Sequence, residues 1–350
     1  MTRRSGLGTF VGRRWALLFL CLELVVFSIV GQGFFSLNGV QIVLFYGTSL
    51  FLLATAETFV IVTGGIDLSV GFIMGFSAVI SAKLVTAMVN AGLAPSTAII
   101  LAIVATLVIG LLPGLLSGFL VGWLRVTSFL ATFATGGIVY GISLLLSGGG
   151  ETKGVPDLAN VIGNSYFLYW APGKGLSFFT RPDVVRGTRV IEMIPSMLVI
   201  TAVVVIVAAF ALKVTRFGRH TYAIGGNEDA AVRAGINIRR HYLVIYALSA
   251  FFSTLAGIIY MLEYITGKPD AGTSFLLDAI VGVVIGGASL YGGAGTVWGT
   301  ILGCLILSVL ETGLRMAGVP TFDKFIAVGL ILIFAVLIDQ FFPELIHKED

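Results

Sequence analysis

Charge is scarce in this sequence of 350 residues: Asp, Glu, Lys and Arg make up only 11% of it, against about 25% in a typical soluble protein. Hydrophobic residues make up 57%. A water-soluble fold would lack the polar surface to cover so much apolar material, which excludes an ordinary cytosolic enzyme and a disordered protein. The net charge of +3 comes from scattered residues, which excludes a nucleic-acid partner. We therefore expect an all-α polytopic membrane protein that is in contact with membrane lipids.

Cysteine and histidine are scarce as well. Cys21 and Cys304 both lie in apolar runs, so we interpret them as small hydrophobic residues rather than as a disulfide or a metal site. The three histidines lie in polar segments without the spacing of metal ligands. No GxxxxGK[ST] segment is present, which excludes ATP binding through a P-loop. We predict no metal site, no bound cofactor and no enzymatic activity on this chain.

Long runs without charge divide the sequence. A helix needs about 20 apolar residues to cross the hydrocarbon core of a membrane. We predict ten such spans, at residues 15–32, 40–62, 68–90, 96–121, 128–147, 195–214, 242–264, 273–290, 296–316 and 324–342. We expect the first of them to be a retained membrane helix rather than a cleaved signal peptide.

The positions of lysine and arginine predict the orientation of the spans, because loops rich in these residues stay in the cytoplasm. Three basic groups fall on one side if the spans alternate: Arg3, Arg4, Arg13 and Arg14; Arg125; and Lys213, Arg216, Arg219, Arg233, Arg239 and Arg240. With ten spans both termini are then cytoplasmic. Arg315 and Lys324 fall on the opposite side, so the last pair of spans is the least constrained. We predict one transmembrane domain over residues 1–350, with an outer loop at 148–194 and a cytoplasmic loop at 215–241.

The outer loop contains three prolines, balanced charge and several aromatic residues. Its apolar periodicity is poor, and we predict a loop with one short surface helix. The aromatic side chains fit two interpretations, a belt at the membrane interface or a docking face for an external partner.

The cytoplasmic loop carries the signals of a short helix. Gly225 and Gly226 break the chain, Asn227 can cap a helix, and acidic residues follow in the first turn, where the helix dipole favours them. Gly235 ends the segment. We predict one helix of about two turns, which is either a solvated connector or a contact for a cytoplasmic partner.

Acidic residues inside the predicted spans are the candidates for a functional site, because a charge in the membrane is costly. Asp67 follows Gly64 and Gly65 and is predicted to cap a helix beginning at Leu68. It is either a functional group at a broken helix or a local cap. Glu57 lies deepest in its span.

Glu263 and Asp278 lie near predicted span ends and are expected to face water, and Glu311 is a further candidate. Glycines at i, i+4 spacing predict close helix packing. They form two series, Gly110, Gly114, Gly118 and Gly122, and Gly295, Gly299 and Gly303.

Three segments in this order resemble the permease of ribose-, xylose- and galactose-type sugar ABC importers: VIVTGGIDLSVG at 60–71, TRFGRHTYAIGGNEDAAVRAGIN at 215–237, and AGTSFLLDAIVGVVIGGASLYGGAGTVWGTILG at 271–303. The similarity runs from about residue 40 to 342. It implies a fold similar to type II ABC importers, in a bacterial inner membrane. The implied partners are a second permease copy or a paralogue, a cytoplasmic ABC ATPase that holds the ATP and Mg²⁺, and a periplasmic sugar-binding protein.

The resemblance also implies roles for residues. The segment that matches the coupling helix, which rests in a groove of the ATPase, contributes Gly225, Gly226, Asn227, Glu228, Asp229, Ala230, Ala231, Arg233, Ala234 and Gly235. The TGGIDLS signature maps to Thr63–Ser69, and we take its polar and glycine residues together with Glu57 as candidates for the translocation path: Thr63, Gly64, Gly65, Asp67, Ser69 and Glu57. The sequence differs from the residues common in this family at Thr127-Ser128, Tyr140-Gly141 and Leu277-Asp278. These differences leave the identity of the sugar open.

The expected function is import of a monosaccharide, a pentose, hexose or related polyol, by alternating access. The alternatives are a nucleoside or a branched-chain amino acid as substrate of the same machinery, an ion-coupled secondary transporter with its site at Glu57 or Asp67, and a membrane scaffold.

Overall fold

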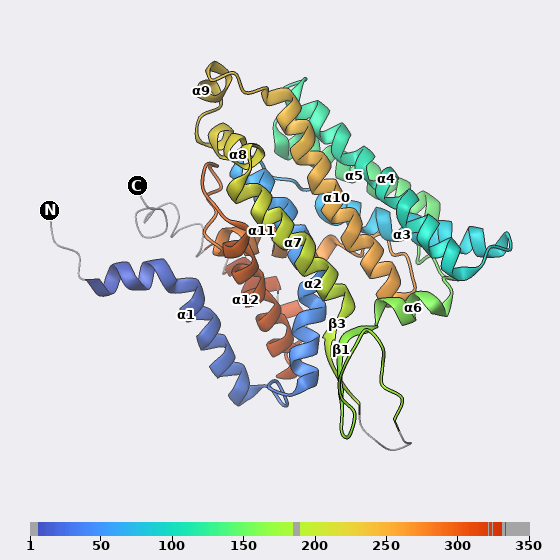
Figure 1. The fold of residues 1–350 in the computed structure, drawn as a ribbon. Coiled ribbons are helices and arrows are strands. Elements are labelled where there is room, and N and C mark those ends of the chain that lie inside the picture. Colours follow the sequence, from blue (N-terminus) through green and yellow to red (C-terminus); the bar gives the residue numbers. More distant parts are fainter. Residues whose placement is uncertain (1–5, 185–189, 321, 324, 331–332, 334–350) are drawn as a thin grey trace.

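A computed structural model of the chain describes residues 6–184, 190–320, 322–323, 325–330 and 333 (Figure 1). Twelve α-helices and three β-strands follow one another up to Met316, and residues 325–330 are helical as well. The helices are α1 (Gly6–Val30), α2 (Leu37–Val62), α3 (Val70–Asn90), α4 (Pro95–Gly122), α5 (Ser128–Ser147), α6 (Asp157–Gly163), α7 (Ser196–Val214), α8 (Arg216–Gly226), α9 (Glu228–Arg233), α10 (Ile238–Tyr264), α11 (Thr273–Ile285) and α12 (Val297–Met316). The strands are β1 (Tyr166–Ala171), β2 (Gly175–Phe178) and β3 (Ile191–Pro195).

Seven of the described helices are long and apolar enough to cross a membrane: α2, α3, α4, α5, α7, α10 and α12. The prediction of a polytopic helical membrane protein is therefore confirmed. The spans predicted at 15–32 and 273–290 correspond to shorter apolar helices, Ala16–Val30 and Thr273–Ile285. The span predicted at 324–342 and both termini lie largely outside the described residues, so the count of ten and the cytoplasmic termini stay predictions.

Helix α10 lies at the centre of the fold and packs against α2, α3 and α4. The predicted glycine ridge of α4 faces it. A Cβ atom added to Gly114 would lie 2.2 Å from the carbonyl oxygen of Tyr246 and 2.5 Å from the Cβ of Ala250. The second glycine series packs in the same way, because Gly299 and Gly303 of α12 lie against Gly286 and Gly282 at and near the end of α11. Both predictions of close packing are confirmed.

Gly114→Val is expected to destabilise the protein, because a side chain at this point must push α4 away from the backbone of α10. Overpacking of this kind costs about 1–3 kcal/mol. The control is Gly137→Val in α5, where an added Cβ meets no atom within 4 Å. Thermal unfolding of the two purified variants in detergent measures the difference, and equal losses of stability would contradict close packing of α4 on α10.

The segment at 148–194, predicted as an outer loop, is more ordered than predicted. The short surface helix is present as α6, but the prediction of a loop for the rest is wrong, since β1, β2 and β3 form an antiparallel sheet in the order β2-β1-β3. Gly173 and Gly175 adopt positive φ angles of 78° and 73° in the β1–β2 turn, which glycine tolerates. The sheet lies at the opposite end of the bundle from α9 (Figure 1).

Two contacts fix this sheet to the start of α2. The Gln41 side chain donates a hydrogen bond to the carbonyl oxygen of Glu192, and the Phe45 ring meets Tyr166 edge to face. Phe178 and Phe179 stay exposed beside Phe167. Such aromatic groups suit a membrane interface or a protein partner equally, and both interpretations stay open.

Candidate functional site

The signature segment Thr63–Ser69 forms the connection between α2 and α3. Helix α2 ends at Val62, and Gly64 follows with a φ of +81°, a left-handed conformation that glycine adopts without strain. The Thr63 hydroxyl donates back to the carbonyl oxygen of Val60 at 2.7 Å. Two hydroxyl groups of α5 accept hydrogen bonds from the backbone of the segment: Ser128 Oγ from the Ile66 N–H at 3.1 Å, and Thr132 Oγ1 from the Leu68 N–H at 3.0 Å. The first turn of α5 therefore holds the segment in place.

Asp67 is buried and fully hydrogen-bonded. One carboxylate oxygen accepts from the N–H of Ser69 at 2.9 Å and from the Ser69 hydroxyl, and the other accepts from the hydroxyl of Ser249 at 2.6 Å. The prediction that Asp67 caps a helix beginning at Leu68 is corrected: α3 begins at Val70, and Asp67 instead bonds its own chain two residues on, as in an Asx-turn. Ser249 belongs to α10, so Asp67 also ties the signature segment to the central helix. The sequence motif gave no signal for Ser249.

Glu57 lies fully buried in α2 next to this segment. Its Oε2 accepts a long hydrogen bond of 3.4 Å from the Asp67 N–H, and its Oε1 has no hydrogen-bond partner among the described residues. The structure therefore brings together Glu57 and Asp67, the two acidic residues that the sequence placed among the candidates for one translocation path.

The other acidic candidates lie apart from this pair. Asp278 was expected to face water but is only 1% exposed, and its carboxylate accepts from the Tyr46 hydroxyl at 2.5 Å. The prediction is wrong because α11 lies inside the bundle against α2 and α12, so the end of its apolar run is not a membrane surface. Glu263 is half-buried with its Oε1 enclosed, which corrects the same expectation there. Glu311 pairs with Arg315 at 3.0 Å.

The segment predicted as a cytoplasmic loop contains two helices rather than the one predicted. The predicted short helix is confirmed as α9: Asn227 Oδ1 accepts from the Ala230 N–H at 2.8 Å, and Gly235 follows with a φ of +82°. Helix α8 was missed because Gly225 and Gly226 were interpreted as a break, whereas they form its last turn. A Cβ atom on Gly225 would lie 1.8 Å from the Val62 carbonyl oxygen, so α8 packs directly on the end of α2.

Polar contacts bind α8 to its neighbours. The Tyr222 hydroxyl donates to the carbonyl oxygen of Gly295 at 2.6 Å, and burial raises the pKa of Tyr222 above its ordinary value, so the group stays a neutral donor. Thr221 Oγ1 and His241 Nε2 lie 3.0 Å apart in a hydrogen bond to α10. Helix α8 is therefore part of the packed domain.

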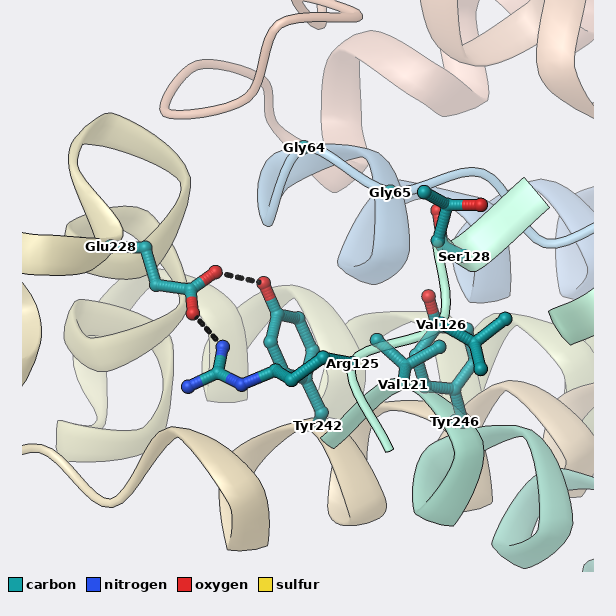
Figure 2. A pocket seen from close by; sticks show the side chains of 10 residues that line it. Gly64, Gly65, Val121, Arg125, Val126, Ser128, Glu228, Tyr242 and Tyr246 are labelled. Carbon is teal, nitrogen blue, oxygen red and sulfur yellow. Dashed lines mark hydrogen bonds and ion pairs between the residues drawn. The ribbon is translucent and has the colours of Figure 1, made fainter. Parts of the chain in front are cut away.

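Helix α9 has one attached edge and one free face. Glu228 forms an ion pair with Arg125 of the α4–α5 connection, and its other oxygen accepts from the Tyr242 hydroxyl at 3.1 Å (Figure 2). Ala231 is buried, at 3% exposure, whereas Val232 is 50% exposed. Val232 was not in the predicted coupling set. The exposed residues of that set are Gly226, Asn227, Asp229, Ala230, Arg233, Ala234 and Gly235.

Arg125 and Tyr242 were not among the residues that the sequence predicted for the site. Arg125 had a signal, since it is the only charged residue between Lys83 and Glu151. It also adopts a φ of 56°, a conformation uncommon outside glycine. Tyr242 gave no signal of its own.

A cavity of about 280 Å³ lies between the signature segment and α9 (Figure 2). It is lined by Gly64, Gly65, Val121, Arg125, Val126, Thr127, Ser128, Glu228, Tyr242 and Tyr246. It joins two of the predicted signature residues and one predicted coupling residue in one site, whereas Thr63, Asp67, Ser69 and Glu57 are not among its lining residues. The described part of the chain contains no group of three or more side chains suited to a metal ion.

Comparison with known proteins gives consistent similarities. A family model described as "Branched-chain amino acid transport system / permease component" matches residues 39–338. Ribose import permease protein RbsC of Bacillus subtilis is 35% identical over 338 residues, 95% of this chain and 92% of that protein, and its Haemophilus influenzae counterpart is 32% identical over 341 residues, 97% of each. Xylose transport system permease protein XylH of Haemophilus influenzae is 46% identical over 146 residues, 42% of this chain and 39% of that protein. No solved structure matches the chain.

Proposed function

Because the chain belongs to the family described as the permease component of branched-chain amino acid transport systems, we propose that it is the membrane-spanning subunit of a binding-protein-dependent ABC importer for a monosaccharide. It is a multi-pass protein of a bacterial inner membrane, and family membership favours a transport subunit over an enzyme. The names of the relatives, ribose import and xylose transport permeases, support a pentose or a similar sugar.

The construction of α9 is the observation that carries this proposal. A capped helix with a free face and an attached edge suits a contact that receives motion from a partner and passes it on. The proposed partner is a cytoplasmic ABC ATPase, which holds ATP and Mg²⁺ and contacts the face around Val232. When the ATPase closes on ATP, α9 moves, and Glu228 transmits the movement to Arg125 and Tyr242. A second permease copy or a paralogue completes the translocation path, and a periplasmic sugar-binding protein delivers the substrate at the sheet formed by β1, β2 and β3.

Two alternatives are separated by the same experiment. The description of the family favours a branched-chain amino acid as the second candidate substrate. Ion coupling at Asp67 has less support, because the oxygens of Asp67 already accept hydrogen bonds from three donor groups. Oε1 of Glu57, the other candidate, has no partner among the described residues, so the test includes an ion gradient. The test is uptake of labelled ribose, xylose and leucine into proteoliposomes that contain the permease, its ATPase and its binding protein. Uptake that needs an ion gradient and no ATP would overturn the proposal, and uptake of leucine alone would replace the sugar.

Val232→Asp is expected to weaken binding of the ATPase roughly thirtyfold, since loss of a central contact costs about 2 kcal/mol. ATP-driven uptake falls with it. The matched control is Val161→Asp in α6, which is 65% exposed at the other end of the bundle. Copurification of the ATPase with each variant measures the effect, and full retention by the Val232 variant would remove α9 as the contact.

A further inference from the structure

The cavity beside the Arg125–Glu228 ion pair (Figure 2) is lined by both polar and aromatic side chains, as ligand-binding sites are. We propose that it is a transient site for the transported monosaccharide on its way to the cytoplasm, and that the Arg125–Glu228 pair is its gate. This inference rests on the proposed function and assigns a place in the protein to the substrate.

The lining suits a molecule with many hydroxyl groups. The lining includes the hydroxyl-bearing residues Tyr242, Thr127 and Ser128 together with Arg125 and Glu228 (Figure 2). Two tyrosine rings supply apolar surface between these polar groups. Ligand sites commonly combine aromatic walls with a few placed donors and acceptors, and they range upwards from about 300 Å³. A cavity of about 280 Å³ therefore fits a small ligand such as one sugar ring.

Tyr246 and Ser128 form the inner wall of the cavity. The Tyr246 side chain is fully buried, and its hydroxyl lies beside that of Ser128. A Cβ on Gly65 would lie 3.0 Å from the Tyr246 hydroxyl and 3.2 Å from Ser128 Oγ, so both hydroxyl groups pack closely against the signature segment. Gly65 is therefore the residue that lets the signature segment approach this wall.

The Arg125–Glu228 pair closes the cavity on the side of α9 and can separate at little cost in stability. The Arg125 and Glu228 side chains are 54% and 37% exposed, and ion pairs with such access to water contribute little net stability. Glu228 is the first residue of α9, so a shift of this helix withdraws the carboxylate from both Arg125 and Tyr242. Movement of the ATPase contact and release of the sugar would then be one event.

Two variants test the site by uptake. Val126→Phe fills the cavity, and Tyr246→Phe removes one hydroxyl while keeping the ring. In proteoliposomes with the partner ATPase and binding protein, sugar uptake per ATP hydrolysed is expected to fall about threefold to tenfold in the Tyr246 variant, the effect of one lost hydrogen bond. It is expected to fall at least as far in the Val126 variant, because the new ring occupies the site. The controls are Val104→Phe, 57% exposed on the outside of α4, and Tyr260→Phe elsewhere on α10. Equal uptake per ATP in variants and controls would overturn the proposal.

A labelling experiment tests whether the sugar occupies the cavity. It compares one variant with and without sugar, so a folding defect cannot be mistaken for loss of binding. Val126→Cys is made together with Cys21→Ser, because Cys21 is exposed whereas Cys304 is buried. In inside-out vesicles, ribose or xylose, whichever the wild type imports, is expected to slow the reaction with a polar maleimide at least twofold, and leucine is not. Labelling that ignores the sugar while wild-type uptake is normal would reject the site alone, whereas absent wild-type uptake would reject the proposed function.

Discussion

Asp67→Ala is expected to abolish uptake and to lower the stability of the folded protein more than Gly114→Val does. It removes the acceptor for the N–H and hydroxyl of Ser69 and for the hydroxyl of Ser249. A buried donor that loses its partner costs about 1–3 kcal/mol. Even with partial relaxation, two or three such groups cost several kcal/mol, a large share of the roughly 5–15 kcal/mol that stabilises a typical domain.

Asp67→Asn separates hydrogen bonding from charge in this prediction. The amide oxygen can keep both bonds from Ser69, and its NH₂ group can donate to the Ser249 hydroxyl once that hydroxyl turns. We therefore expect thermal unfolding of the Asn variant in detergent to lie close to that of the wild type, with Ser249→Ala between the two Asp67 variants. An Asn variant as unstable as the Ala variant would show that the negative charge, rather than the hydrogen-bond network, matters at this position.

The sequence predicted those features of the structure that depend on residues close together in the chain. The cap by Asn227 and the end at Gly235 each depend on neighbours within three or four residues, so the bounds of α9 could be read directly. The glycine ridge of α4 was predictable for a similar reason, since its spacing places Gly110 and Gly114 on one helix face. Membrane character followed from composition alone.

Contacts between distant segments set the rest, and no local signal reports them. The Arg125–Glu228 pair joins residues 103 apart in the chain, and Ser249 reaches Asp67 across 182 positions. Asp278 was misplaced for the same reason, because only the packing of α11 against α2 and α12 decides that it is buried. The three-stranded sheet was missed since its pairing depends on register between strands, and its sequence has little alternation of apolar and polar residues.

Glu228→Arg is expected to uncouple transport, with uptake per ATP hydrolysed reduced by about tenfold, a typical size for the coupling between two sites. The new side chain would face Arg125 with the same charge and would lose the hydrogen bond from Tyr242. The free face of α9 is unchanged by this substitution. The ATPase is therefore expected to copurify normally, which distinguishes this variant from Val232→Asp.

The double variant Arg125→Glu/Glu228→Arg restores opposite charges across the same contact, and we expect it to regain several-fold of the lost uptake per ATP. Recovery will be incomplete, because an arginine at position 228 cannot accept the hydrogen bond that Tyr242 donates to Glu228. The double variant leaves the net charge unchanged, and Glu151→Arg, at an exposed position in the segment predicted to lie outside, controls for the change in net charge that Glu228→Arg makes alone. If the double variant is no better than Glu228→Arg alone while the ATPase still binds, then α9 does not act through Arg125, and the movement must pass through the packing of Ala231 or of α8 against the end of α2.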